Sequence, residues 1–185
     1  MKIVTFLNHK GGVSKTVSCI HLSFYLTKIK KGSRVLLIDL DHQMNLTDFF
    51  VKEKSLKNIE TVFSDYNTID DSITETRYKN ISILQGSENI PLLEHQIQID
   101  NHPWDCLQNI FKKSKRISTD FDYVIIDTHP GIYPFVSCAL IASDYYVIPL
   151  VSECNFSLDG LLKVEKFIDF VKQKHNSNVY ALGYF

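Results

Sequence analysis

The sequence feature that most constrains the fold is residues 7–16, LNHKGGVSKT, which join an apolar N-terminal segment to a helical pattern. Gly11 and Gly12 allow backbone dihedral angles that other residues avoid, so successive N–H groups can turn toward one anion. Lys15 adds a positive charge and Thr16 a hydroxyl at the start of the following helix, whose N-terminus also favours phosphate. These residues predict a phosphate-binding loop between a strand and a helix.

The loop departs from the common P-loop pattern G-x-x-x-x-G-K-[ST] at both glycine positions. Asn8 stands where the first glycine is expected and Ser14 where the second is expected, while a second lysine, Lys10, precedes the glycine pair. The pattern that results, K-G-G-x-x-K-[ST], resembles the deviant P-loop of the ParA/MinD family of partition and cell-division ATPases. For this segment alone, the simpler alternative is a glycine turn with two surface lysines.

The resemblance implies ATP or ADP with Mg²⁺ as ligands. In that family the extra lysine reaches across a dimer interface to the partner's nucleotide, which would be the role of Lys10, while Lys15 serves the phosphates within one subunit. It therefore implies that both lysines are catalytic and that a homodimer forms when ATP binds. The implied nucleotide-binding residues are Lys10, Gly11, Gly12, Val13, Ser14, Lys15, Thr16 and Val17.

Apolar runs typical of buried parallel strands alternate with helical patterns along the chain. The first strand, helix and second strand form a βαβ unit with a right-handed crossover. We therefore expect one α/β domain over residues 1–185 with a three-layer P-loop NTPase fold, in which helices cover both faces of a mostly parallel sheet. Strands are expected at 1–7, 34–39, 80–85, 123–127, 145–150 and 179–185, and helices at 16–30, 46–51, 59–63, 103–117 and 157–174.

Acidic residues end two of the expected strands. Asp39 and Asp41 follow the second strand, and Asp127 ends the later run YVIID. Because parallel strands place these ends at one edge of the sheet, the carboxylates should lie near Lys15 and Thr16. Phosphoryl transfer needs Mg²⁺, which proteins hold with few ligands plus waters and phosphates. Thr16 is the candidate direct metal ligand, and Asp127 matches a Walker B aspartate acting through metal-bound water.

Two further segments extend the resemblance. The sequence DLDHQ resembles the D-x-D-P-Q segment of partition ATPases, which implies that Asp41 positions the attacking water and Asp39 helps to hold the metal site. The sequence DTHPG resembles their D-T-P-P segment. A histidine replaces a proline in each, as His42 and His129. We expect His129 to have no catalytic role, and a solvated acidic turn is the simpler alternative for the aspartate pair.

The likeness continues through residues 90–94, 139–145 and 149–153 and so spans nearly the whole chain. It stops at Phe185, where family members continue with a loop that contacts adenine and with helices that often bind DNA. We therefore expect either a short member of the family or a fragment.

Composition limits the partners that the chain can recognise. Its 20 basic and 21 acidic residues give a net charge of −1, which provides no global signal for nucleic acid or membrane binding. The basic residues 112–116 are expected to complement a helix C-terminus rather than to bind DNA. Asp70 and Asp71 should form a solvated turn. Cys19, Cys106, Cys138 and Cys154 lack metal-site spacing, and we expect them to be reduced and mostly buried.

No segment resembles a signal peptide or approaches the roughly 18 apolar residues of a membrane span, so a soluble cytoplasmic protein is expected, with nucleoid association left open. The leading hypothesis is a Mg²⁺-dependent ATPase that forms a nucleotide-switched dimer in plasmid or chromosome partitioning. Hydrolysis would be weak without a ParB-like centromere-binding partner, and non-specific DNA is a further candidate partner. The alternatives are a non-catalytic nucleotide-binding regulator, a MinD-like positioning ATPase, and an iron-protein reductase using Cys138 and Cys154.

Overall fold

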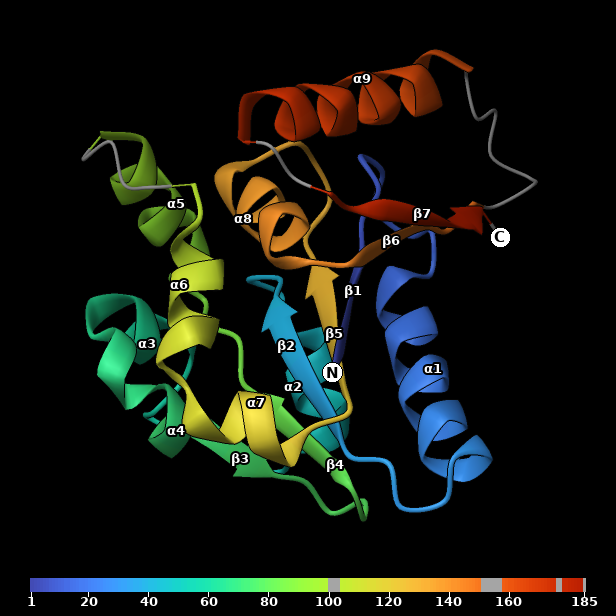
Figure 1. Ribbon diagram of the computed structural model, residues 1–185. Helices are drawn as coiled ribbons and strands as arrows, with labels where there is room; N and C mark the ends of the chain where they lie inside the picture. Colours follow the sequence, from blue (N-terminus) through green and yellow to red (C-terminus); the bar gives the residue numbers. More distant parts are fainter. Residues whose placement is uncertain (100–103, 151–157, 176–177, 185) are drawn as a thin grey trace.

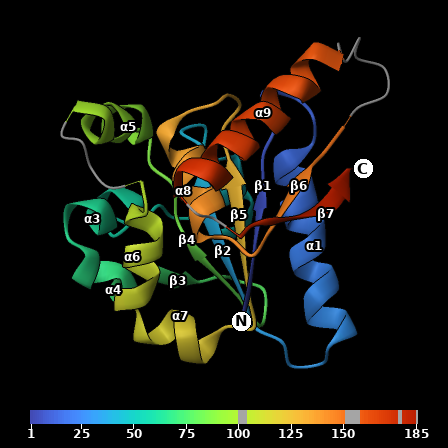
Figure 2. The same cartoon turned by 45° about the horizontal axis from the view of Figure 1, so that its top comes forward.

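The computed structural model describes residues 1–99, 104–150, 158–175 and 178–184. Within these ranges a seven-stranded sheet has the order β3-β4-β2-β5-β1-β6-β7. Neighbouring strands are parallel throughout the described sheet, apart from the antiparallel pair of β3 and β4. Helices lie on both faces of this sheet (Figures 1 and 2). The predicted three-layer α/β fold with a mostly parallel sheet is confirmed.

Each of the six predicted strands is present, with small shifts at the ends. The sequence did not predict β3, because three residues at a sheet edge are too few to show a periodic pattern. The strands are β1 (Lys2–Phe6), β2 (Val35–Leu40), β3 (Ile73–Glu75), β4 (Ile81–Leu84), β5 (Tyr123–Thr128), β6 (Tyr145–Ile148) and β7 (Tyr180–Tyr184).

The helices include several that the sequence pattern did not predict. In α8 all nine residues are buried, so the segment has no polar face and hence no amphipathic period. The described helices are α1 (Lys15–Ile29), α2 (Asn45–Phe50), α3 (Ile59–Ser64), the 3₁₀ helix η1 (Tyr66–Thr68), α4 (Ile69–Ser72), α5 (Ile90–Ile99), α6 (Cys106–Lys113), α7 (Lys115–Asp120), α8 (Pro134–Ala142) and α9 (Leu158–His175). None of these helices is long and apolar enough to cross a membrane.

Strand β2 lies at the centre of the core and is buried along its whole length. Val35 and Leu37 pack in one apolar cluster with residues of α1 and α2. Leu36, Ile38 and Leu40 pack in a second cluster on the opposite face, with residues of α3, α5, α6 and α8. Alternate residues therefore serve different layers, which explains why the strand has a continuous apolar sequence.

The predicted helix over residues 103–117 is wrong in its extent. Residue 103 lies outside the described residues, and the remainder forms two helices, α6 and α7, on either side of Ser114. The Ser114 side chain accepts a hydrogen bond from the Ile117 backbone N–H (2.9 Å) and so caps α7, while its hydroxyl bonds to the Asp70 carboxylate. Local helical spacing did not reveal this interruption, because Asp70 is distant in the sequence.

Asp70 is consequently not part of a solvated turn, because it belongs to α4 and contacts the start of α7. The basic segment is also divided between two helices. Lys112 and Lys113 lie in the last turn of α6, as expected, but Arg116 lies in α7. The Arg116 guanidinium donates to the Asp70 carbonyl (2.9 Å) and pairs with Glu75 (3.2 Å), so this cation joins α7 to α4 and β3.

The Ser114→Ala variant should lower the free energy of unfolding by about 1–2 kcal/mol, because it removes an N-cap that a second helix also contacts. Ser118→Ala provides the control, since that exposed hydroxyl bonds to a carbonyl of its own helix and its loss should cost less than about 0.5 kcal/mol. Urea denaturation of the two variants measures the difference. Equal stability of the two would contradict the assigned cap.

Candidate nucleotide site

The predicted phosphate-binding loop has left-handed backbone geometry at one of its two glycines and, unexpectedly, at a serine. It connects β1 to α1, and Gly12 and Ser14 have left-handed dihedral angles, with φ of 73° and 64°. A left-handed serine is strained, and such strain persists where the surrounding structure enforces it. Ser14 is also the N-cap of α1, yet its side chain does not cap the helix. The Ser14 side chain therefore leaves the first N–H groups of α1 available to an anion.

Asn8 fixes the beginning of the loop. Its side-chain amide donates to the Pro149 carbonyl (2.8 Å), and its amide oxygen accepts from the Lys10 N–H (3.0 Å). The Asn8 carbonyl also accepts from the Gly131 N–H (3.4 Å). The Asn8 side chain thus joins the loop to the segment after β6, and the Asn8 backbone joins it to the loop after β5. From the sequence, Asn8 is interpreted only as a departure from the first glycine of the P-loop pattern. An asparagine whose side chain accepts from the N–H two residues later is a known turn signal and could have predicted its role.

Lys15 is buried inside the loop. Its ammonium group donates to the Lys10 carbonyl (3.0 Å), so the side chain curls back over the loop backbone. Burial lowers the pKa of Lys15, whereas the nearby carboxylates of Asp127 and Asp41 act in the opposite direction. The loop lysine and two predicted acidic residues therefore belong to one electrostatic cluster.

Asp39 and Asp127 lie side by side in this cluster. The register of β2 and β5 pairs the two residues directly, and both are fully buried. Burial raises the pKa of Asp39 to about 6 and that of Asp127 to about 8. Repulsion from the Asp39 charge adds to the shift at Asp127, whereas the Thr16 hydroxyl and the Lys15 charge oppose it. Two carboxylates are costly here unless positive charge is nearby.

The two carboxylates differ in their hydrogen bonds. Asp39 accepts from the Asp41 N–H (3.1 Å) and from both the N–H (2.8 Å) and the hydroxyl (2.7 Å) of Thr47. The Thr47 hydroxyl accepts in turn from the Gly86 N–H (3.0 Å). Asp39 therefore fastens the segment 41–47 to the end of β4, and its interactions are those of a residue that holds the site together.

Asp127 has a different environment. Neither of its carboxylate oxygens has a hydrogen-bond partner of ordinary geometry among the described residues, although the Thr16 hydroxyl and the Cys19 thiol approach closely enough to interact with it. A buried polar group without a partner requires an explanation, and a missing ion is one of the accepted explanations. The Thr16 hydroxyl and the Lys15 charge both lower the pKa of Asp127 and so favour its ionised form. A hydroxyl beside an unpaired carboxylate, at the start of a helix, fits Mg²⁺ that is shared with phosphates. The described residues contain no cluster of three or more His, Cys, Asp or Glu side chains suited to a metal.

A pocket of about 620 Å³ opens above these groups. Asp41 faces it, and its carboxylate accepts from the Gln43 N–H (2.9 Å) and lies 3.6 Å from the His42 ring. The structure thus brings Lys15, Thr16 and Asp41 together, while Asp39 and Asp127 lie buried beneath them and Lys10 and Gly11 are outside the lining. The lining comprises Gly12, Val13, Ser14, Lys15, Thr16, Val17, Ile20, Asp41, His42, Gln43, Asn45, Phe49 and Pro130.

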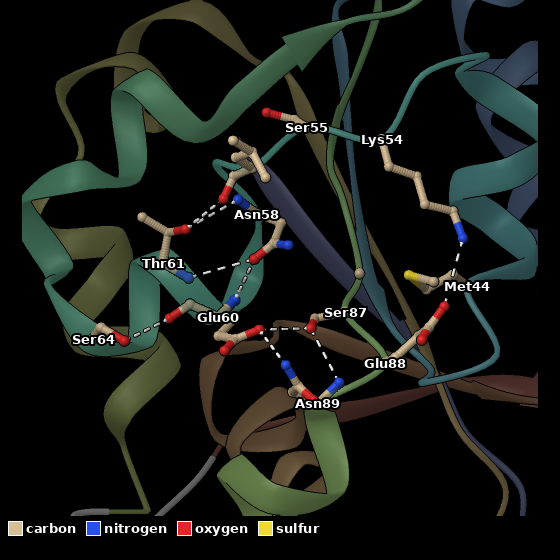
Figure 3. A pocket seen from close by; sticks show the side chains of 12 residues that line it. Met44, Lys54, Ser55, Asn58, Glu60, Thr61, Ser64, Ser87, Glu88 and Asn89 are labelled. Atoms are coloured by element: carbon tan, nitrogen blue, oxygen red, sulfur yellow. Dashed lines mark hydrogen bonds and ion pairs between the residues drawn. The ribbon is translucent and has the colours of Figure 1, made fainter.

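A second pocket, of about 610 Å³, lies beside the end of β4 and was not predicted (Figure 3). Lys54 lies between Asp48 (3.7 Å) and Glu88 (3.9 Å), and the Glu60 carboxylate accepts from Ser87 (2.9 Å) and from the side chain of Asn89 (2.9 Å). Because these polar groups pair with one another, a ligand in this pocket would have to compete with the existing contacts.

The cysteines do not match the arrangement of an iron-binding dimer site. Cys19, Cys106 and Cys138 are free and buried, as expected, and the Cys106 and Cys138 sulfurs lie 3.0 Å apart between α6 and α8. Cys138 therefore lies inside the subunit rather than at its surface. Cys154 lies outside the described residues, as do Ser152 and Glu153 of the segment that resembles the partition ATPases.

The sequence profile of the AAA domain family matches residues 1–181. The chain is 31% identical over 172 residues to the virulence plasmid ParA family protein pGP5-D of Chlamydia psittaci, which covers 90% of the chain and 63% of that relative. It is 27% identical over 192 residues to the sporulation initiation inhibitor protein Soj of Bacillus subtilis, which covers 98% of the chain and 70% of Soj. The chain therefore spans less than two thirds of the chlamydial relative.

Solved structures agree with this relationship. Cobyrinic acid a,c-diamide synthase from Mycobacterium smegmatis, with bound ATP analog and magnesium, superimposes with a TM-score of 0.89 at 25% identity. That match covers 100% of the chain and 74% of the synthase. The chain belongs to the AAA domain family and, within it, to the nucleotide-binding proteins of the ParA/MinD type.

The Asn8→Ala variant should lower the free energy of unfolding by about 1–3 kcal/mol, because it removes two side-chain hydrogen bonds, one to the Pro149 carbonyl and one from the Lys10 N–H. Asn67→Ala is the control, since the Asn67 side chain is exposed and bonds only locally to Asp65 (2.9 Å). Denaturant titration compares the two variants. If Asn8→Ala is no more destabilised than Asn67→Ala, Asn8 does not anchor the loop.

Proposed function

We propose that this chain is an ATPase that requires Mg²⁺ and changes its assembly state with its nucleotide, as a partition ATPase of the ParA type. The observation that carries the proposal is the unpaired Asp127 carboxylate, buried beside Lys15 and Thr16 at the start of α1. This arrangement matches the need of a phosphoryl-transfer site for a cation held between protein and phosphates. The family relationship supports the same assignment.

The residues in and beneath the pocket would have different roles in nucleotide binding and hydrolysis. The N–H groups of residues 11–17 and the Lys15 ammonium would hold the phosphates of ATP or ADP. Thr16 would bind Mg²⁺ directly, and Asp127 would contact the water ligands of Mg²⁺. Asp39 would help to hold the metal site through its hydrogen bonds to the segment 41–47. When bound, Mg²⁺ neutralises the charge that develops on the transferred phosphoryl group. Asp41 faces the pocket and would orient the attacking water.

Lys10 is assigned to the dimer. Within one subunit, Lys15 already occupies the loop, whereas Lys10 is outside the lining of the pocket. In a dimer held together by nucleotide, Lys10 would contact the phosphates of the partner. A ParB-like protein that stimulates hydrolysis and non-specific DNA are the proposed cellular partners, and the proposed location is the cytoplasm.

The hydrolysis proposal is tested by phosphate release from ATP. Lys15→Ala should abolish nucleotide binding because it removes the ammonium group inside the loop. Asp41→Ala should still bind ATP but lower the hydrolysis rate by about 100-fold or more, as expected for loss of a group that positions the attacking water. Asp71→Ala removes an exposed carboxylate of α4 that pairs with Lys57 (3.4 Å) and should leave the rate unchanged.

Normal hydrolysis by Asp41→Ala would refute the assignment of that residue. Nucleotide binding by the wild type without any phosphate release would instead identify a non-catalytic nucleotide-binding regulator.

The dimer proposal is tested by light scattering after size exclusion. In an Asp41→Ala background, ATP with Mg²⁺ should convert the protein to a dimer, because hydrolysis no longer reverses assembly. Adding Lys10→Ala should keep the protein monomeric with ATP bound, whereas Lys28→Ala, on the exposed side of α1, should not. If the Lys10→Ala protein dimerises as readily as its parent, Lys10 does not reach the partner's nucleotide.

A further inference from the structure

A buried ion pair lies behind the nucleotide pocket, between α5 and the loop that follows β5. The His129 ring nitrogen Nε2 lies 3.0 Å from Glu94 Oε1, and both side chains are buried. The other ring nitrogen, Nδ1, lies 2.9 Å from the Pro130 carbonyl oxygen. Since a carbonyl can only accept, Nδ1 is the nitrogen that donates to Pro130, and Nε2 is left to share a hydrogen bond with the Glu94 carboxyl group.

The electrostatics agree with this description. Burial lowers the pKa of His129, but the hydrogen bond to Glu94 and the Glu94 charge raise it by more, so that the net shift is upward. A buried pair of this kind is costly to break, because removal of one partner leaves the other charged or unpaired.

Glu94 holds both ends of one loop. The oxygen that pairs with His129 also accepts from the Phe135 N–H (3.0 Å), at the start of α8. The segment 129–135 is therefore fastened to α5 at its beginning and near its end. Within it, Gly131 has a φ of 122° and the Tyr133 ring contacts the His129 ring, with 4.8 Å between ring centroids.

The same loop forms part of the nucleotide pocket. Pro130 lines the pocket and packs on the phosphate-binding loop, where its Cγ would lie 3.5 Å from a Cβ built on Gly11. The Gly131 N–H bonds to the Asn8 carbonyl (3.4 Å). On the other side, the ring centroids of His129 and His42 lie 6.4 Å apart, and His42 is the residue after Asp41. A short chain of contacts therefore connects Glu94 with the lining of the pocket.

We infer that Glu94 is a positioning residue for the nucleotide site, which acts through His129 to hold the loop 129–135 against the phosphate-binding loop. The inference rests on the proposed function, because it requires that the pocket binds nucleotide. In this inference His129 holds the loop in place and takes no part in hydrolysis. The imidazole ring supplies the hydrogen-bonding partner for Glu94 that a proline at this position could not, since proline has no polar side-chain atom.

The test compares Glu94→Ala, Glu94→Gln, His129→Ala and the double variant Glu94→Ala/His129→Ala. Binding of a fluorescent ADP analogue with Mg²⁺ should weaken by about tenfold in each alanine variant, in the range expected for coupled members of one hydrogen-bond network. The double variant should be no weaker than either single variant. Glu94→Gln should restore most of the affinity, because its amide oxygen can still accept from His129 and Phe135. Glu88→Ala, on an exposed side chain nearby, is the matched control and should bind as the wild type does.

Hydrogen–deuterium exchange without nucleotide provides an independent readout. Glu94→Ala should speed exchange in the peptide that contains the Phe135 amide, while peptides of the central strands keep their protection and show that the variant is folded. Wild-type affinity in folded Glu94→Ala, or losses that add in the double variant, would overturn the inference. If the wild type itself binds no nucleotide, the proposed function fails, and unchanged exchange in Glu94→Ala would then show separately that Glu94 does not hold the loop.

Discussion

The interaction on which the site depends is the pairing of two buried carboxylates, Asp39 and Asp127, across adjacent central strands. Burial raises the pKa of Asp39 to about 6 and that of Asp127 to about 8, and repulsion from the Asp39 charge adds to the shift at Asp127. The fold offsets this cost unequally. Asp39 receives three hydrogen bonds from Asp41 and Thr47, whereas neither Asp127 oxygen has a partner of ordinary geometry among the described residues, although Thr16 and Lys15 lie close to it. A cation at the end of the sheet would complete the charge balance.

Three buried polar side chains then hold the loops around this pair. Asn8 fastens the phosphate-binding loop to the end of β6, Asp39 fastens the segment 41–47, and Glu94 fastens the loop after β5. Each of the three bonds to backbone groups of a different chain segment, so the loops keep fixed positions relative to one another. Such preorganisation lowers the cost of aligning groups around a phosphoryl group when it binds.

Much of this arrangement could be predicted from the sequence. Continuous apolar runs identified the central strands, and glycines followed by Lys15 and Thr16 identified the phosphate-binding loop. The parts that could not be predicted depend on contacts between distant segments. Helix α8 is buried on every side and so has no amphipathic period. Ser114 ends one helix and begins the next, where its hydroxyl bonds to the distant Asp70. Glu94 has the sequence context of an exposed helical glutamate, and only the fold brings His129 beside it. The roles assigned to the individual site residues stay predictions, which covers residues 10–17, Asp39, Asp41 and Asp127.

The central claim is that the unpaired Asp127 carboxylate serves a magnesium ion that is shared with nucleotide phosphates. Calorimetric titration of ADP in the presence and absence of Mg²⁺, for the wild type and for Asp127→Asn, tests it directly. We expect Mg²⁺ to increase the affinity of the wild type for ADP. In Asp127→Asn the factor by which Mg²⁺ increases this affinity should be about 10- to 100-fold smaller, while ADP binding without Mg²⁺ persists. An equal gain from Mg²⁺ in both proteins would contradict the account.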